Sequence, residues 1–187
     1  MIYDIGCDHG KLGRSFLDEP MVSSIHLVDP SIEVIKNLKD SYITEQDFKI
    51  TIEHKSGQDL VLRPEKKLIL IAGMGGKEIG SILTHLLPQL TVDDDVIISP
   101  HRDILPLRES LALSTFYLKD ESVVLDEGRF YQVICLSLSG NVKVHSYGTK
   151  IWGGETGRGY REHQLLHFNA HKDTRSLAYV SFLKALT

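Results

Sequence analysis

Short apolar stretches rich in β-branched residues recur along the first half of the chain. Each ends near Gly, Asp or Ser, as buried strands do, and the five stretches cover residues 1–6, 24–29, 48–53, 67–73 and 95–99. Segments with helical spacing lie between or after them. This alternation predicts an α/β domain whose sheet is largely parallel, with helices on both faces.

Three segments place their apolar residues at helical spacing. The strongest pattern covers residues 79–90, where Ile and Leu recur along one face. A weaker helix is expected over residues 32–39, where Pro30 and Ser31 act as start signals. A third helix is expected over residues 105–113.

The alternation of strands and helices ends at residues 116–140, where two long stretches rich in strand-forming residues flank Asp126-Glu127-Gly128. This pattern is typical of a β-hairpin and brings the expected sheet to seven strands. A dinucleotide-binding fold has no need of a closing hairpin, whereas the Rossmann-like class I methyltransferase fold ends in an antiparallel one. We therefore expect that fold.

A short helical C-terminal tail should follow the hairpin. The stretch WGGETGRG at residues 152–159 predicts a glycine-rich link, and residues 160–171 and 175–186 predict two helices. We expect a sheet domain over residues 1–140 and a linker with a helical extension over residues 141–187.

Composition narrows the class of protein. With 42% hydrophobic and 25% charged residues, the 187-residue chain is expected to be globular. It shows neither an apolar run of the roughly 18–20 residues that span a bilayer nor the layout of a signal peptide. Cys7 and Cys135 are too few for a disulfide framework or a structural zinc site. A soluble, cytoplasmic protein without a membrane or metal partner is expected, and the oligomeric state is left open.

The charge is unevenly distributed. The net charge of −4 disfavours non-specific coating of nucleic acid, but from His145 onward six Lys or Arg face three Asp or Glu. The excess of basic residues in this C-terminal segment fits a solvated helical face as well as a surface that contacts RNA. His163, His167 and His171 share one predicted helix face, but spacing alone does not predict a metal site.

The loop DIGCDHG at residues 4–10 raises the question of its ligand, because ligands of open α/β sheets bind at the carboxyl ends of the strands. A pyrophosphate-binding fingerprint has a glycine where this loop has Asp8, which would repel phosphate. S-adenosylmethionine has no phosphate and carries sulfonium and ammonium cations, for which Asp4 and Asp8 are suitable neighbours. The methyltransferase pattern acidic-x-Gly-x-Gly-x-Gly matches except at its middle glycine. We therefore expect S-adenosylmethionine as the cofactor of the sheet domain.

Two signals downstream agree with a nucleoside ligand. Asp29 ends the second predicted strand, where an acidic residue binds ribose hydroxyls in folds of this kind. Gln58 or Asp59 follows the third strand and can reach an adenine edge. Each signal alone also fits a strand or helix end, but their order after successive strands favours the cofactor.

The fourth predicted strand leads into Ala72-Gly73-Met74-Gly75-Gly76. Many amino-group methyltransferases have Asn/Asp-Pro-Pro-aromatic there. The glycines leave backbone near the transfer site and admit a flat base, and they also suit a tight turn into the next helix.

Three segments together resemble the bacterial tRNA (adenine-N1)-methyltransferases, which modify an adenosine in the D-loop region of tRNA. They are DIGCDHGKL, IAGMGGKEIGSIL and EGRFYQVI, at residues 4–12, 71–83 and 127–134. The resemblance extends from about Ile2 to about Ser139 and implies methyl transfer to N1 of adenine, with tRNA as the partner.

The resemblance also implies roles for individual residues. Asp8 and His9 would be catalytic, with Asp8 orienting the adenine, while Pro100 and His101 would border the base pocket. The cofactor would be held by residues after the first four strands, namely Asp4, Gly6, Cys7, Asp29, Pro30, Gln58, Asp59, Ala72, Gly73 and Met74.

Three features depart from the family. The first strand begins almost at Met1, where the family has a leading helical segment, so truncation of the start is left open. Cys7 replaces a small hydroxyl residue, and the tail after Gly140 is shorter than the family's helical arm. The alternatives are a methyltransferase for a small molecule or protein, and a non-catalytic S-adenosylmethionine-binding module.

Overall fold

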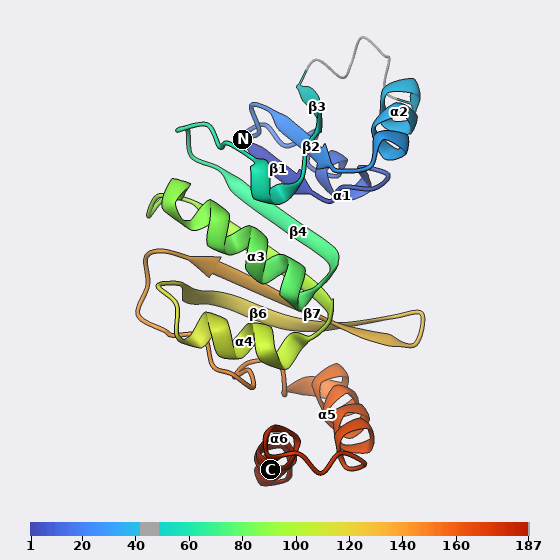
Figure 1. Ribbon diagram of the computed structural model, residues 1–187. Coiled ribbons are helices and arrows are strands. Elements are labelled where there is room, and N and C mark those ends of the chain that lie inside the picture. Colours follow the sequence, from blue (N-terminus) through green and yellow to red (C-terminus); the bar gives the residue numbers. More distant parts are fainter. Residues whose placement is uncertain (42–48, 187) are drawn as a thin grey trace.

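The computed structural model describes residues 1–41 and 49–186, and within them it contains one seven-stranded sheet (Figure 1). The strand order is β3-β2-β1-β4-β5-β7-β6. The strands are β1 (Ile2–Ile5), β2 (Ile25–Asp29), β3 (Ile50–His54), β4 (Leu68–Gly75), β5 (Asp95–Arg102), β6 (Tyr117–Asp126) and β7 (Arg129–Ser137). The first five are parallel, and β7 runs antiparallel to both β5 and β6. The expected sheet is confirmed, and Phe48 of the third expected strand lies outside the described residues.

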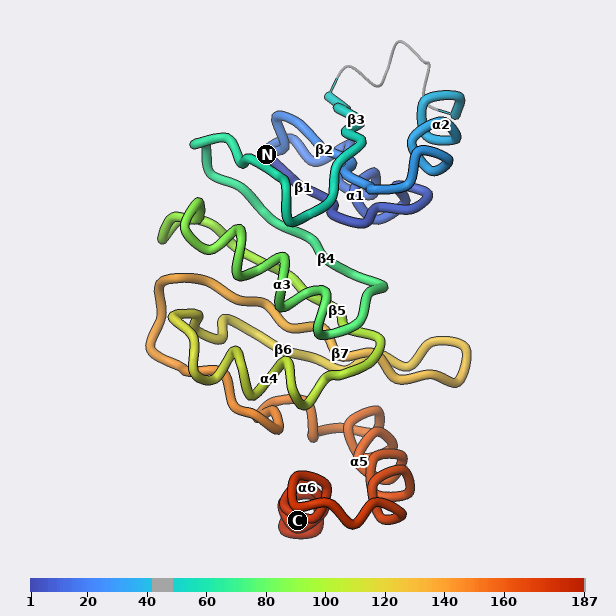
Figure 2. The backbone as a smooth tube through the Cα atoms, in the orientation of Figure 1, coloured from blue at the N-terminus to red at the C-terminus, as the bar shows by residue number. Residues whose placement is uncertain are grey.

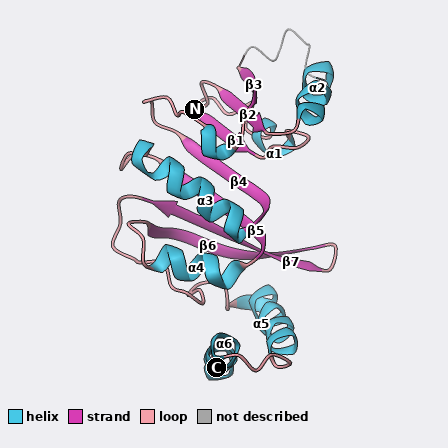
Figure 3. Cartoon of the chain, viewed as in Figure 1, coloured by secondary structure: helices cyan, strands magenta, loops and turns pink. Residues whose placement is uncertain are grey.

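Helices cover both faces of the sheet, as expected (Figure 3). They are α1 (Lys11–Arg14), α2 (Ile32–Ser41), α3 (Gly76–Leu86), α4 (Ile104–Ala112), α5 (Gly154–Phe168) and α6 (Thr174–Ala185), with single turns η1 (Gly57–Asp59) and η2 (Leu87–Gln89). Because side chains alternate along a strand, Ile69 and Ile71 of β4 join the core with α3 and α4, whereas Leu70 joins the core with α2.

The central position of β1 determines where a ligand can bind. β1 pairs with β2 on one side and with β4 on the other. The chain leaves β1 toward β2 and β3, and then returns to β4 on the opposite side of β1. This is a topological switch point, where the loops at the carboxyl ends of β1 and β4 diverge and leave a crevice.

The glycine-rich stretch after the hairpin is not the open link that the sequence suggests, because α5 already begins at Gly154. Its glycines allow the helix to pack closely. A Cβ at Gly157 would lie 2.5 Å from the carbonyl carbon of Trp152, and one at Gly159 would lie 3.3 Å from Cζ of Phe130. The helix also ends at Phe168, so His171 lies outside it and the expected three-histidine face is not formed.

The helical extension packs beside α4, and the two chain ends lie at opposite ends of the molecule (Figure 2). It has its own small core around Tyr179 and Leu183, completed by Leu105 of α4 and lined by aromatic side chains. The predicted boundary at Gly140 falls shortly after β7, and the division into two units stays a prediction. Among the described residues, no helix is long and apolar enough to cross a membrane.

A buried ion pair fastens the extension to the sheet. Nη2 of Arg108 in α4 lies 2.5 Å from Oε2 of Glu121 in β6, and neither side chain is exposed. Nη1 of Arg108 donates to Gln132 of β7 at 2.9 Å, and Gln132 donates to the hydroxyl of Tyr160 in α5, also at 2.9 Å. Two backbone N–H groups of the loop before α5 donate to the other oxygen of Glu121. Burial raises the pKa of Glu121, but Arg108 and these N–H groups outweigh it and hold that pKa below its ordinary value.

We expect Arg108→Ala to destabilise the protein by about 3–5 kcal/mol, because the charge of Glu121 would remain buried without its partner. Urea unfolding followed by circular dichroism measures the change. Lys119→Ala is the control, because it breaks a pair with Asp95 in which the lysine is 54% exposed, and it should cost at most about 1 kcal/mol. Equal losses in the two variants would contradict the fastening role of Arg108.

Candidate functional site

The sheet brings most of the predicted site residues to one edge. The loop after β1, the end of β2, the turn η1 after β3 and the end of β4 all lie at the carboxyl ends of parallel strands. Residues that are distant in sequence thereby line the crevice at the switch point.

The loop after β1 is shaped by left-handed backbone. Gly6, Asp8 and Gly10 have φ angles of 70°, 47° and 65°. Glycine adopts this conformation without strain, and Asp is among the few other residues that tolerate it. The N–H groups of Gly6 and Cys7 donate to the carbonyl of Val28 at 2.8 and 3.2 Å. The loop is therefore held against the end of β2.

Asp4 supports this loop from inside the fold. Its side chain is buried, and Oδ2 accepts the N–H of Gly13 at 2.8 Å. The pKa of Asp4 is raised to about 6, mainly by burial and also by the charge of Asp29, against the lowering effect of the Gly13 N–H. The arrangement positions the start of α1, and direct contact of Asp4 with a cofactor stays a prediction.

Cys7 is buried with the side chains under α2. Burial, together with the charges of Asp4 and Asp29, raises the pKa of its thiol to about 12. The thiol is therefore neutral and unreactive at neutral pH. The backbone of Cys7, rather than its sulfur, is what the loop can offer to a ligand.

Asp29 closes the loop from β2. Its Oδ2 accepts the N–H of Asp8 at 3.2 Å, and its Oδ1 accepts the N–H of Ser31 at 2.8 Å. Each carboxylate oxygen keeps a second acceptor position, which suits two neighbouring hydroxyl donors. The carbonyl of Pro30 is bonded to Nε2 of His54 at 2.9 Å.

Asp8 and His9 lie on the solvent-exposed side of the loop after β1. Their side chains are 72% and 71% exposed, and His9 Nε2 lies 3.8 Å from Asp8 Oδ2. Together with Val34 and Leu38 of α2 they line a small hollow of about 50 Å³. Both side chains are accessible to an incoming substrate, and their catalytic roles stay predictions.

Gln58 and Asp59 are held in η1 by different partners. Nε2 of Gln58 donates to Oε1 of Glu78 in α3 at 2.7 Å, which ties η1 to that helix. Oδ2 of Asp59 accepts the hydroxyl of Ser56 at 2.9 Å. The structure places them in the loop that follows β3, the strand beside Asp29.

The end of β4 contacts the loop after β1. The pairing of β4 with β5 shifts register between Ala72 and Met74, and Gly73 has a φ of 77°. Such an irregularity re-aims the following side chain. A Cβ at Gly6 would lie 1.9 Å from Cε of Met74, so the methionine side chain lies directly on the glycine.

A hollow of about 370 Å³ opens beside this contact. It is lined by Gly73, Met74, Gly75, Glu78, His101 and Arg102. The sequence pattern predicts the first two and His101 as site residues, but it does not indicate Glu78 or Arg102. An acidic residue in the first turn after a glycine pair was a signal for Glu78. Arg102 lies across Gly75, where a Cβ would be 2.8 Å from its Nε, and no local pattern indicates that contact.

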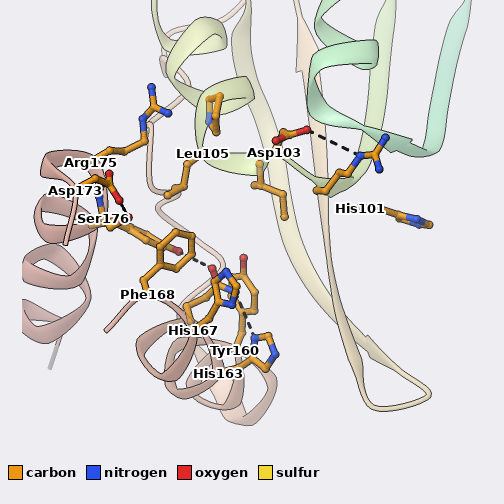
Figure 4. Close-up of a pocket in the computed structure, with 15 residues that line it drawn as sticks. His101, Asp103, Leu105, Tyr160, His163, His167, Phe168, Asp173, Arg175 and Ser176 are labelled. Carbon is orange, nitrogen blue, oxygen red and sulfur yellow. Dashed lines mark hydrogen bonds and ion pairs between the residues drawn. The ribbon is translucent and has the colours of Figure 1, made fainter. Parts of the chain in front are cut away.

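A separate cavity of about 650 Å³ lies between α4 and the extension (Figure 4). Among its charged groups, Arg175 pairs with Glu109, Asp173 caps α6 through Ser176, and Nε of Arg102 lies 4.0 Å from the carboxylate of Asp103. His101 also lines this cavity, although in Figure 4 its ring points away from His167 and Phe168. Among the described residues, no group of three His, Cys, Asp or Glu side chains is arranged to hold a metal ion.

The polar groups around the crevice fit S-adenosylmethionine. The carboxylates of Asp4, Asp8 and Asp29 gather around the loop, which disfavours a pyrophosphate and favours a cationic ligand. Asp29 retains acceptor positions for hydroxyl groups. Gly6 has no Cβ, so its backbone is open to close approach.

Comparison with known proteins agrees with this chemistry. A family model described as a methyltransferase domain matches residues 1–134. The tRNA (adenine(22)-N(1))-methyltransferase of Bacillus subtilis (strain 168) is 31% identical over 135 residues, which cover 70% of this chain and 56% of that protein. The chain thus spans less than two thirds of the length of the curated relatives it matches.

Solved structures resemble the chain over nearly its whole length. The Streptococcus pneumoniae protein Sp1610 in complex with S-adenosyl-L-methionine gives a TM-score of 0.80 at 19% identity, covering 98% of this chain and 90% of that one. M. capricolum TrmK in complex with S-adenosyl-homocysteine gives 0.75 at 14% identity, covering 98% and 86%. At these identities the likeness shows the fold alone, and it confirms the expected Rossmann-like methyltransferase fold.

We expect the titration of Asp4 to make the protein less stable as the pH rises from about 4 to about 6. Its pKa of about 6 lies above the ordinary value of 3.8 for a solvated carboxyl, so the folded state binds the proton more tightly than the unfolded state does. The contribution, at most about 3 kcal/mol, is present at low pH and is lost across this window. Urea unfolding at several pH values measures it. Asp4→Asn keeps an oxygen for Gly13 and should remove this component, whereas an unchanged pH slope in the variant would contradict the assignment.

We expect Gly6→Ala to destabilise the protein by several kcal/mol, because the added Cβ meets Met74 and the backbone is left-handed. Gly154→Ala is the matched control, since Gly154 has a φ of 68° but nothing within 4 Å of an added Cβ. The control should cost only about 1–2 kcal/mol, from backbone strain. Thermal unfolding compares the two variants. Equal shifts would mean that contact with Met74 does not restrict the loop.

Proposed function

The chain belongs to the methyltransferase domain family, and we propose that it is an S-adenosylmethionine-dependent enzyme that methylates N1 of an adenosine in tRNA. The observation that carries the proposal is the contact between the acidic, phosphate-repelling loop after β1 and the glycine-rich end of β4. The loop suits a sulfonium cofactor, and the glycines leave space beside it for a flat base. The name of the Bacillus subtilis relative supports tRNA as the substrate. A tRNA substrate implies a cytoplasmic enzyme.

The residues around the switch point would share the binding of the cofactor. Asp29 would accept hydrogen bonds from ribose hydroxyls, and Gln58 and Asp59 would border the adenine. Further contacts to the cofactor are predicted from the backbone and side chains of Gly6, Cys7, Pro30, Ala72, Gly73 and Met74. Asp4 would support the loop after β1. When bound, S-adenosylmethionine supplies an electrophilic methyl group.

The target adenine needs positioning more than proton transfer. N1 of adenine is unprotonated at neutral pH and has a free lone pair, so no general base has to act before the attack. Asp8 would accept a hydrogen bond from the exocyclic amino group and thereby orient the N1 edge, with His9 beside it. Holding two reacting groups in line is worth about 7–11 kcal/mol at best.

The proposal is tested by incubating the purified protein with labelled S-adenosylmethionine and bulk tRNA from a strain that lacks its gene. We expect label in tRNA, recovered as 1-methyladenosine by mass spectrometry of nucleosides. Label in a small molecule or protein instead would assign a different substrate. Cofactor binding without transfer to any of these acceptors would leave a non-catalytic binding module.

Two variants separate the roles within the site. Asp29→Ala should abolish measurable cofactor binding in calorimetry, because it removes both hydroxyl acceptors. Asp8→Ala should bind the cofactor within about threefold of the wild type and lose at least tenfold in turnover, since one charge-assisted hydrogen bond is worth about 1.5–3 kcal/mol. Unchanged turnover of Asp8→Ala would contradict the proposal that Asp8 orients the adenine.

A further inference from the structure

The tip of the β6–β7 hairpin and the side of α5 enclose another hollow at the same edge of the sheet. In Figure 3 the hairpin projects beyond the ends of the neighbouring strands. The hollow measures about 260 Å³ and is lined by aromatic, imidazole and guanidinium groups, from His101, Gly128, Arg129, Phe130, Tyr131 and His163. None of the predicted cofactor residues lines it.

His101 connects this hollow to the crevice of the proposed methyl transfer. The same side chain lines the 370 Å³ hollow that contains Gly73 and Met74. Because β7 runs antiparallel to β5, Tyr131 near the start of β7 lies beside His101 near the end of β5. Their ring centroids are 5.4 Å apart. An RNA strand that places one base beside Gly73 would continue along these two rings.

The rings around the hollow remain accessible. His101 and His163 are exposed, and Phe130 and Tyr131 are only partly buried. The ring centroids of Phe130 and His163 lie 5.5 Å apart. Partly exposed aromatic and imidazole rings beside a groove are what proteins use to stack unpaired bases.

The charges beside the rings suit a phosphate backbone. Arg129 lines the hollow, is exposed, and has no ion pair within the part of the chain that the structure describes. Arg102 is 81% exposed, and its Nε lies 4.0 Å from the carboxylate of Asp103, a long and solvent-screened ion pair that a phosphate can replace. Two such cations near unpaired bases are complementary to RNA.

The walls of the hollow are fixed in advance. Gln132, next to Tyr131, accepts a hydrogen bond from the buried Arg108 and donates one to Tyr160 of α5. Tyr160 lies three positions before His163, on the same side of the helix. The hairpin wall and the α5 wall are therefore connected through buried hydrogen bonds, and binding a base requires little further ordering.

We propose that this hollow stacks the nucleobase adjacent to the target adenosine, with Tyr131 and His101 as the platform and Arg129 at the backbone phosphate. The inference rests on the proposed tRNA methyltransferase function. Stacking accepts any base, so the hollow holds the strand bound beside Gly73 without reading its sequence.

The test begins with the wild-type protein and the tRNA transcript in which it forms 1-methyladenosine. Tyr131→Leu should raise the KM for this tRNA about tenfold, with kcat changed less than twofold, because a base stack contributes to binding. Tyr131→Phe keeps the ring and should restore the KM. Tyr117→Leu makes the same substitution at the far end of the hairpin and should leave both constants unchanged.

Transcripts that lack the base on the 5′ or the 3′ side of the target identify the stacked nucleotide. For the wild type, one abasic transcript should raise the KM about tenfold. The KM of Tyr131→Leu should not change with the same transcript, because the ring on which that base stacks is already absent from the variant. Equal losses in the wild type and in Tyr131→Leu on both abasic transcripts would overturn the inference.

The outcomes keep the two proposals separate. A wild type that methylates no tRNA contradicts the proposed function itself. A wild type that methylates tRNA, with a Tyr131→Leu variant of unchanged KM, contradicts only the stacking hollow. Should Tyr131→Leu unfold, 2-aminopurine at each neighbouring position reports stacking in the wild type. Its fluorescence should be quenched on binding, and unquenched fluorescence at both positions would reject the hollow.

Discussion

The hydrogen bonding of β1 to β2 on one side and to β4 on the other is the constraint on which the site depends. It places the loop after β1 where the chain direction diverges, so that Asp29 reaches the loop from β2 and Met74 reaches it from β4. The two contacts could not exist together if β1 lay at the edge of the sheet. The site is thus a consequence of strand order, and its chemistry depends on which residues stand at the strand ends.

Electrostatics then selects the ligand. Carboxylates surround the loop at the place where nucleotide-binding loops present N–H groups to a phosphate. The unfavourable energy of this arrangement is reflected in the pKa of Asp4, which is raised mainly by burial and further by the charge of Asp29. A cationic ligand relieves such an arrangement, and an anionic one makes it worse. Cofactor preference and local stability therefore have the same origin.

The extension illustrates a different use of buried charge. Arg108 and Glu121 are fully buried and gain their stability from each other and from the backbone and side-chain groups around them. A hydrophobic contact would tolerate sliding, whereas this network fixes the positions of the hairpin and of α5. The same network determines the shape of the hollow next to His101. It therefore connects the packing of the extension to the proposed binding of the substrate.

The sequence by itself determined the sheet, the closing hairpin and the acidic loop, because strand periodicity and turn chemistry are properties of neighbouring residues. It also indicated Asp29 at the end of β2 from its place in the order of strands. Only the tertiary structure decided that Met74 lies on Gly6, that Arg102 crosses Gly75, and that His101 meets Tyr131. It likewise turned the glycine-rich stretch before Tyr160 into the first turns of α5, since those glycines are required by contacts with Trp152 and Phe130. These contacts depend on which surfaces meet after folding, and residues that are distant in the chain leave no common period in the sequence.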